Sequence, residues 1–185
     1  MKQYLRYSIV LLLVVVLLLF LLMIVKENTQ DYTVIIFFAS IIILVLYAFL
    51  KLRKVLHHEK TEFESYKLAV FVPVGALSSY FLNHEAGLGP VFGAAIVGLL
   101  ASFIPNLNKK SAYLQGLPTA IYCGAFIGMS HLKIADGYAF VLTASFFTGI
   151  FLMVSKSVLQ GVGGKLGALA FLGVVVTYFL LMLIR

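Results

Sequence analysis

The chain has 185 residues, of which 62% are apolar and 11% are charged, and its formal net charge is +7. A soluble domain of this length cannot bury so much apolar surface, so the composition favours a membrane protein. An excess of Lys and Arg would suggest a nucleic-acid partner in a soluble protein. Cytoplasmic loops of membrane proteins carry the same excess, so we expect no nucleic acid. The single cysteine, Cys123, lies in an apolar segment and excludes a disulfide framework.

Seven apolar stretches have the length of transmembrane helices, because a bilayer core of about 30 Å needs roughly 20 helical residues. The first begins at Ser8 and consists almost entirely of Leu, Val and Ile. Lys2 and Arg6 would suit the start of a signal peptide, but the apolar core is long and no small-residue cleavage site follows it, so we predict a retained helix. The predicted spans are 8–25, 32–50, 67–83, 87–105, 116–131, 137–155 and 165–184.

Positive charge gathers in alternate gaps between these stretches. With the N-terminus in the cytoplasm, eleven Lys and Arg residues lie inside and only Lys26, Lys133 and Arg185 lie outside. The positive-inside bias therefore predicts a cytoplasmic N-terminus and an external C-terminus. The predicted fold is an all-α, polytopic integral membrane helix bundle of about seven transmembrane helices. In a bacterium it would lie in the cell (inner) membrane.

The two halves of the chain differ in composition. Residues 1–50 contain neither Gly nor Pro and are predicted to form a lipid-facing transmembrane hairpin. Residues 51–67 form a predicted basic cytoplasmic linker, in which Lys51, Arg53 and Lys54 meet anionic headgroups of the lipid bilayer. Residues 68–185 form a predicted Gly-rich transmembrane core. Its glycines either hold the bundle together or form an interface, and we expect a homo-oligomer or a partner membrane subunit.

A weak internal sequence similarity appears when the chain is aligned with itself at an offset of 49 residues. Each copy would contain two helices, so the copies would be parallel, with the third reduced to one helix. Chance agreement is the alternative, because Gly and Leu are abundant. The aligned sets include Leu68 with Leu117 and Leu166, and Gly75 with Gly124 and Gly173.

The third and fifth spans are short and each contains Pro and Gly. Short, interrupted segments at corresponding positions of repeats often mark the substrate site of transporters, so we expect these spans and the sixth to line a polar pathway. The alternative is that each hydroxyl bonds only to the backbone of its own helix. The predicted pathway-lining residues are Ser78, Ser79, Tyr80, Asn83, Thr119, Tyr122, Ser130, Thr143, Ser145 and Thr148.

The outer ends of the third and fifth spans hold the one ionisable cluster of the core. Its members are His84, Glu85, His131 and Asp136. Two imidazoles and two carboxylates could bind a divalent cation or respond to pH. The alternative is that they are solvated loop residues.

A glycine-rich turn precedes Lys165 at the cytoplasmic entry to the last span. Backbone amides and a Lys at a helix start suit an anion or a lipid headgroup. It is not a nucleotide-binding P-loop, because Leu159 stands where the first Gly should be and Leu166 stands where Ser or Thr should be.

The sequence does not predict an enzyme, and we expect no cofactor. None of its seven acidic residues lies in the middle of a predicted span, so general acid–base or ion-coupling chemistry in the bilayer has no candidates. The leading hypothesis is a small channel or uncoupled facilitator for an ion or small solute, with a path lined by spans three, five and six. The alternative is a non-transporting membrane subunit that anchors or assembles partner proteins. Convergence of the polar side chains on one lumen would favour the channel, and their scatter would favour the subunit.

Overall fold

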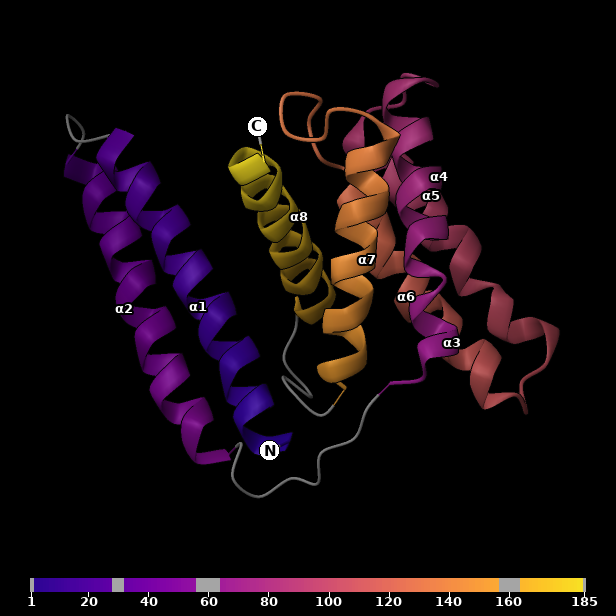
Figure 1. The fold of residues 1–185 in the computed structure, drawn as a ribbon, viewed down its shortest axis with the longest axis horizontal. Coiled ribbons are helices and arrows are strands. Elements are labelled where there is room, and N and C mark those ends of the chain that lie inside the picture. Colours follow the sequence, from indigo (N-terminus) through magenta and orange to yellow (C-terminus); the bar gives the residue numbers. More distant parts are fainter. Residues whose placement is uncertain (1, 28–31, 56–63, 157–163, 185) are drawn as a thin grey trace. The chain divides into compact units, whose positions relative to one another are not determined.

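The computed structural model describes residues 2–27, 32–55, 64–156 and 164–184 (Figure 1). Within these ranges the chain forms eight α-helices, one 3-10 helix and no strand, which confirms the all-α part of the predicted fold. Its internal contacts divide it into two compact units, residues 1–61 and 62–185.

The first unit contains a pair of helices, α1 (Lys2–Glu27) and α2 (Tyr32–Val55), which lie side by side and run in opposite directions (Figure 1). Both helices are continuous because neither contains Gly or Pro. Large apolar side chains point outward from both, including Leu19 at 54% exposure and Ile36 at 71%. The pair therefore leaves much apolar surface uncovered, and its lipid-facing role stays a prediction.

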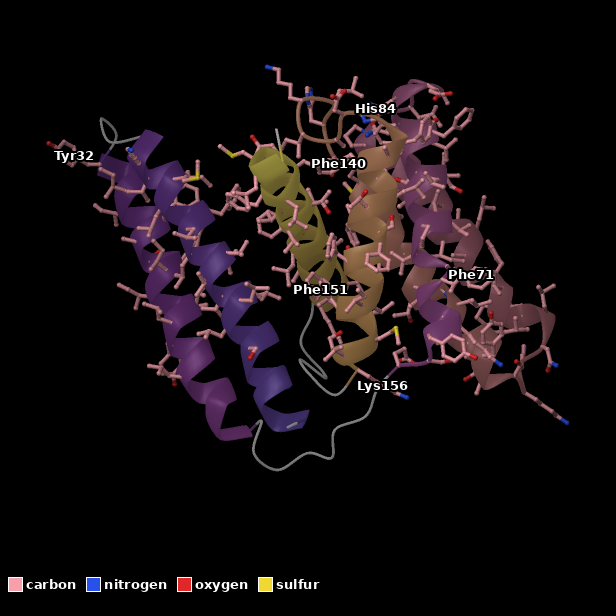
Figure 2. All side chains as sticks on the ribbon, in the orientation of Figure 1. Tyr32, Phe71, His84, Phe140, Phe151 and Lys156 are labelled. Carbon is pink, nitrogen blue, oxygen red and sulfur yellow. The ribbon has the colours of Figure 1, made fainter. Side chains whose placement is uncertain are left out.

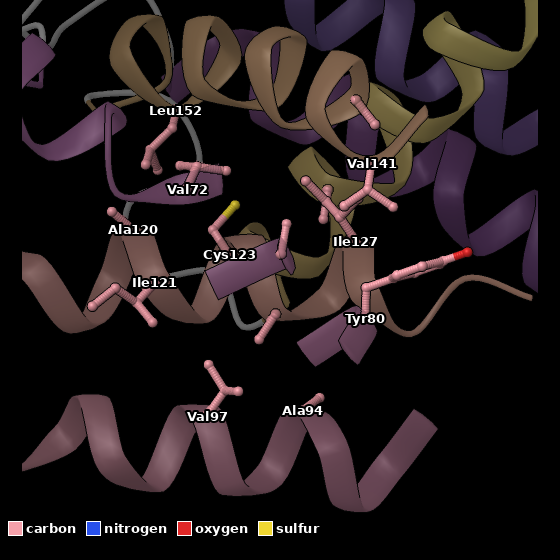
Figure 3. Close-up of a cluster of buried hydrophobic side chains, with 14 of the residues drawn as sticks. Val72, Tyr80, Ala94, Val97, Ala120, Ile121, Cys123, Ile127, Val141 and Leu152 are labelled. Atoms are coloured by element: carbon pink, nitrogen blue, oxygen red, sulfur yellow. The ribbon is translucent and has the colours of Figure 1, made fainter. Parts of the chain in front are cut away.

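In the second unit α4 packs against α5, α6 and α7, and α8 packs against α6 and α7. Figure 3 shows part of this core, in which Val72 of α4, Ile127 of α6 and Val141 of α7 are fully buried. The helices of the second unit are α3 (Tyr66–Ala69), α4 (Val72–His84), α5 (Pro90–Ser102), the 3-10 helix η1 (Ile104–Leu107), α6 (Ala112–Gly128), α7 (Tyr138–Val154) and α8 (Lys165–Ile184).

Two of the predicted continuous spans are interrupted at or near a proline. The predicted span 67–83 consists of α3 and α4, with a break just before Pro73, which has no N–H to donate to the carbonyl of Ala69. The predicted span 87–105 consists of α5 and η1 and changes to the tighter 3-10 form near Pro105. Each of these segments is therefore composite.

Glycine brings the backbones of α4 and α6 into direct contact. A Cβ atom on Gly75 would fall on the carbonyl oxygen of Ile121, and a Cβ atom on Gly124 would fall on that of Val72. One on Gly128 would also meet the α4 backbone. Val72 lies against Gly124, and Ala76 and Tyr80, which follow it on α4, lie against Gly128, which follows Gly124 on α6, so the two helices run parallel. A side chain at any of these glycines would force the helices apart.

Two stretches are long and apolar enough to cross a membrane, Pro90–Leu107 and Lys165–Leu183. Shorter apolar helical stretches are Leu11–Lys26, Ile35–Tyr47 and Tyr138–Val154. These lengths concern only the described part of the chain. The predicted count of seven spans and the predicted orientation stay predictions.

The α4–α6 contact predicts the effect of enlarging its glycines. We expect Gly124→Ala to lower the free energy of unfolding by about 2 kcal/mol or more, because the added methyl group meets a backbone carbonyl. The matched control is Gly167→Ala on α8, where an added Cβ has no atom within 4 Å. There we expect no loss, and a gain of up to about 1 kcal/mol from helix propensity. Unfolding in mild detergent measures both, and equal stabilities would contradict the close contact.

Candidate functional site

A group of polar and aromatic side chains gathers where α4 ends and α7 begins. Tyr80, Asn83 and His84 lie at i, i+3 and i+4 on α4 and therefore share one face of its last turns. Figure 2 shows His84 at this end of the second unit. Glu85 follows α4 directly, and Tyr138 is the first residue of α7. We call these five residues the Tyr80 cluster; the sequence prediction did not include Tyr138.

Hydrogen bonds from the Tyr80 cluster hold the connection between α6 and α7. The Tyr80 hydroxyl donates to the carbonyl oxygen of Ala135 over 3.2 Å, and Asn83 Nδ2 donates to that of Gly128 over 3.0 Å. Both donors are buried. The Tyr138 hydroxyl donates to the carboxylate of Glu85, which ties the start of α7 to the end of α4. The cluster therefore fixes the course of a segment that contains no helix.

One ring nitrogen of His84 has two neighbours that need opposite protonation states. Nε2 lies 3.0 Å from the carbonyl oxygen of Ser130 and 3.1 Å from Nδ2 of Asn83. A protonated Nε2 donates to the carbonyl, whereas an unprotonated Nε2 accepts from the amide. The ring also packs on Tyr80, with 4.5 Å between centroids. The pH response predicted for His84 stays a prediction.

The four residues of the predicted ionisable cluster have different surroundings. His84 and Glu85 belong to the Tyr80 cluster, whereas the exposed His131 accepts a hydrogen bond from the backbone N–H of Lys133 over 3.2 Å. Asp136 lines a groove described below. Across the described ranges no group of three or more His, Cys, Asp and Glu side chains could hold a metal ion. The described residues thus give no support to the predicted cation site.

The predicted pathway residues occupy three kinds of position. Two hydroxyls bond to their own helix: Thr143 donates to Ala139 over 2.8 Å and the buried Ser145 donates to Val141 over 2.6 Å. Both bonds run four residues back along the chain, as is common for hydroxyls in apolar helices. Exposed positions are held by Ser78, Thr119, Tyr122 and Thr143, buried positions by Ser79, Tyr80, Asn83, Ser145 and Thr148, and a half-buried position by Ser130.

Two of the buried hydroxyls have no hydrogen-bond partner among the residues that the structure describes. These are the Ser79 hydroxyl on α4 and the Thr148 hydroxyl on α7, and both residues are fully buried. Ser79 lies opposite Gly128, and Thr148 lies against Gly173 of α8. A buried polar atom without a partner is uncommon, because it loses its hydrogen bonds to water without replacement.

A groove lies between α7 and α8 beside the connection that the Tyr80 cluster holds. We call it the α7/α8 groove; its volume is about 640 Å³. Figure 2 shows Phe140 at this end of α7. The sequence gives no signal for the α8 side, because its side chains there resemble the rest of an apolar helix. The lining residues are Leu132, Lys133, Ile134, Asp136, Ala139, Phe140, Thr143, Tyr178, Leu181 and Met182.

A second groove of about 310 Å³ lies between α6 and α8. Gly167 of α8 opens onto it, and an added Cβ on this glycine has no described atom within 4 Å. The lining residues of this α6/α8 groove are Phe126, Met129, Ser130, Gly167, Ala170, Phe171 and Val174.

Lys165 faces the end of α7. Its half-buried ammonium group donates to the carbonyl oxygens of Ser155 and Lys156, the latter over 3.2 Å. A cation is favourable here because the last carbonyls of a helix have no partner within the helix. The two bonds join the start of α8 to the end of α7, and the predicted contact with an anion or headgroup stays a prediction. The side chains of Lys51, Arg53 and Lys54 lie outside the described residues.

No protein family, curated protein or solved structure was found to match this chain. Any functional conclusion therefore rests on its own residues.

The Tyr80 cluster predicts a stability difference between two tyrosines. We expect Tyr80→Phe to lower the free energy of unfolding by about 1 kcal/mol, because the buried carbonyl of Ala135 loses its side-chain donor and keeps only the backbone N–H of Gly137. Tyr138→Phe is the control, and we expect a smaller loss because water can replace its exposed hydroxyl. Unfolding monitored by circular dichroism compares them. A larger loss for Tyr138→Phe would contradict the arrangement.

Proposed function

We propose that the chain is a polytopic integral membrane helix bundle with seven spans, a cytoplasmic N-terminus and an external C-terminus. Its two longest apolar stretches support this, because only 22% of Pro90–Leu107 and 28% of Lys165–Leu183 is buried, whereas a core helix of a soluble protein is mostly buried. Large exposed side chains such as Phe92 at 70% and Phe146 at 63% add to the uncovered apolar surface. Lipid is the solvent that such a surface requires.

Within the membrane we propose that it is a non-transporting, non-enzymatic subunit that anchors or assembles another membrane chain. The observation that carries this proposal is the scatter of the predicted pathway residues. Thr143 and Ser145 bond to their own backbone, Tyr80 and Asn83 bond to a connecting segment, and exposed hydroxyls lie on the bundle surface. A water-filled path would need these groups on one shared surface.

The α6/α8 groove is the face that we propose for assembly. Membrane helices associate through small residues that allow close approach. Gly75, Gly124 and Gly128 already lie in contacts inside the bundle, whereas an added Cβ on Gly167 would meet none of the described atoms. Gly167, Ala170 and Val174 follow helical spacing along this groove, which suits a transmembrane helix of another chain.

Enlarging Gly167 tests this face without disturbing the fold. We expect Gly167→Leu to weaken assembly at least about tenfold, because the new side chain fills the groove that a partner helix would enter. The control is Ala95→Leu, which enlarges an exposed small residue on α5. The measurement is the size of the complex that each variant forms in lipid nanodiscs. The variants compared must have the same helicity and stability as the wild-type protein. Unchanged assembly of Gly167→Leu, or an uncomplexed wild-type protein, would refute the role.

A channel or uncoupled facilitator is the second candidate, and it is favoured by the buried hydroxyls of Ser79 and Thr148, which have no hydrogen-bond partner in the described part of the chain. Water inside the bundle would satisfy both groups, and a chain of such waters could serve as a path. Its cargo would be an ion or small solute.

Alanine and valine substitutions separate the two candidates. For a non-transporting subunit, Ser79→Ala and Thr148→Val should keep or raise the free energy of unfolding, because each removes a buried hydroxyl that has no partner. Liposomes holding the wild-type protein should then show no flux for monovalent ions, divalent ions or small neutral solutes. Selective flux that either substitution abolishes would instead establish the channel.

A further inference from the structure

The α7/α8 groove has the size of a small-molecule site. Its volume of about 640 Å³ lies within the roughly 300–1,000 Å³ that such sites occupy. One wall is α7 with Ala139, Phe140 and Thr143, and the other is the end of α8 with Tyr178 and Met182. Tyr178 is 46% exposed and Met182 is 67% exposed, so the α8 wall is not covered by the other described helices of the second unit.

The charged and the apolar residues of this groove come from different segments of the chain. The charged residues, Lys133 and Asp136, both come from the connection between α6 and α7. The helical walls are apolar or aromatic except for Thr143, whose hydroxyl already donates to the carbonyl of Ala139. A charged end beside an apolar trough fits a molecule that has a polar head and an apolar body.

The two charged residues define the chemistry of the head. An ammonium group such as that of Lys133 binds phosphate, and a carboxylate such as that of Asp136 binds an ammonium group. A carboxylate can accept from several donors, so this contact is compatible with others that Asp136 makes. A head with only negative charge would be repelled by the carboxylate, so one phosphate with one ammonium group is the better match.

We propose that the α7/α8 groove binds one glycerophospholipid with a zwitterionic head, its phosphate at Lys133 and an acyl chain along Tyr178, Leu181 and Met182. The inference rests on the membrane location given under the proposed function. A partner helix fits this groove less well, because the charged connection would lie against its apolar surface. Phosphatidylethanolamine has the required head, with a compact ammonium group.

The test measures lipid retained by the purified full-length chain in detergent, using native mass spectrometry with equal amounts of phosphatidylethanolamine and phosphatidylglycerol. We expect the wild-type protein to retain the first lipid preferentially. Lys133→Ala should reduce retention about tenfold through loss of a charge-assisted bond, and Ala139→Trp should do so by filling the groove. Asp136→Asn should shift the preference toward phosphatidylglycerol.

Matched controls place the same changes elsewhere. Lys109→Ala removes an exposed lysine from another connection, and Ala95→Trp enlarges an exposed alanine on α5. Both should keep wild-type retention. No retained lipid on folded protein, or equal losses in the controls, would overturn the proposal. Alkaline extraction of membranes distinguishes failure of the membrane location from failure of the lipid site. Release of the chain would refute both, whereas a chain that stays in the membrane but retains no lipid would refute only the site.

Discussion

The backbone contact between α4 and α6 is the constraint on which the second unit depends. Gly75 and Gly124 each face a carbonyl of the other helix, so neither position can hold a side chain without moving a backbone. In the proposed membrane location, lipid would give apolar helices little reason to associate, and close approach would supply dispersion and Cα–H···O contacts instead. Because α4 and α6 run parallel, the helix that follows each of them must return antiparallel. α5 and α7 therefore pack across the pair, α5 also on α6 and α7 also on α4.

The same contact relates to the 49-residue offset found in the sequence. Gly75 precedes Gly124 by this offset, and Val72 precedes Ile121 by it. Gly75 faces Ile121, and its counterpart Gly124 faces Val72, which is the counterpart of Ile121. The two contacts are therefore related as if by a two-fold axis. Such reciprocity would follow from two parallel copies, and the repeat itself stays a prediction. Gly173, the third aligned glycine, instead faces Thr148 of α7, so α8 packs in a different way.

Sequence patterns predicted where helices form more accurately than they predicted which residues the helices bring into contact. Continuous apolar runs specify helix, but the break before Pro73 depends on which carbonyl loses its donor. His84 and Glu85 were found because ionisable residues stand out in an apolar chain. Tyr138 was missed, because a tyrosine at a helix end does not show which carboxylate it will reach. The hydroxyls of Ser79 and Thr143 look alike in sequence, yet one is enclosed and the other exposed, since that depends on which face each helix turns inward.

Both proposed ligands would contact the same helix. Gly167, Val174, Tyr178 and Leu181 fall on one face of α8, and the α6/α8 and α7/α8 grooves follow one another along it. Lys165 fixes the first turn of α8 to the last carbonyls of α7, while its last turns are exposed. The width of either groove therefore depends on the tilt of α8 relative to its first turn, which Lys165 holds in place. A partner helix that moved α8 would change the affinity for lipid, and by linkage lipid would change the affinity for the partner by the same factor. A shared helix would thus couple the two proposed binding events in one equilibrium.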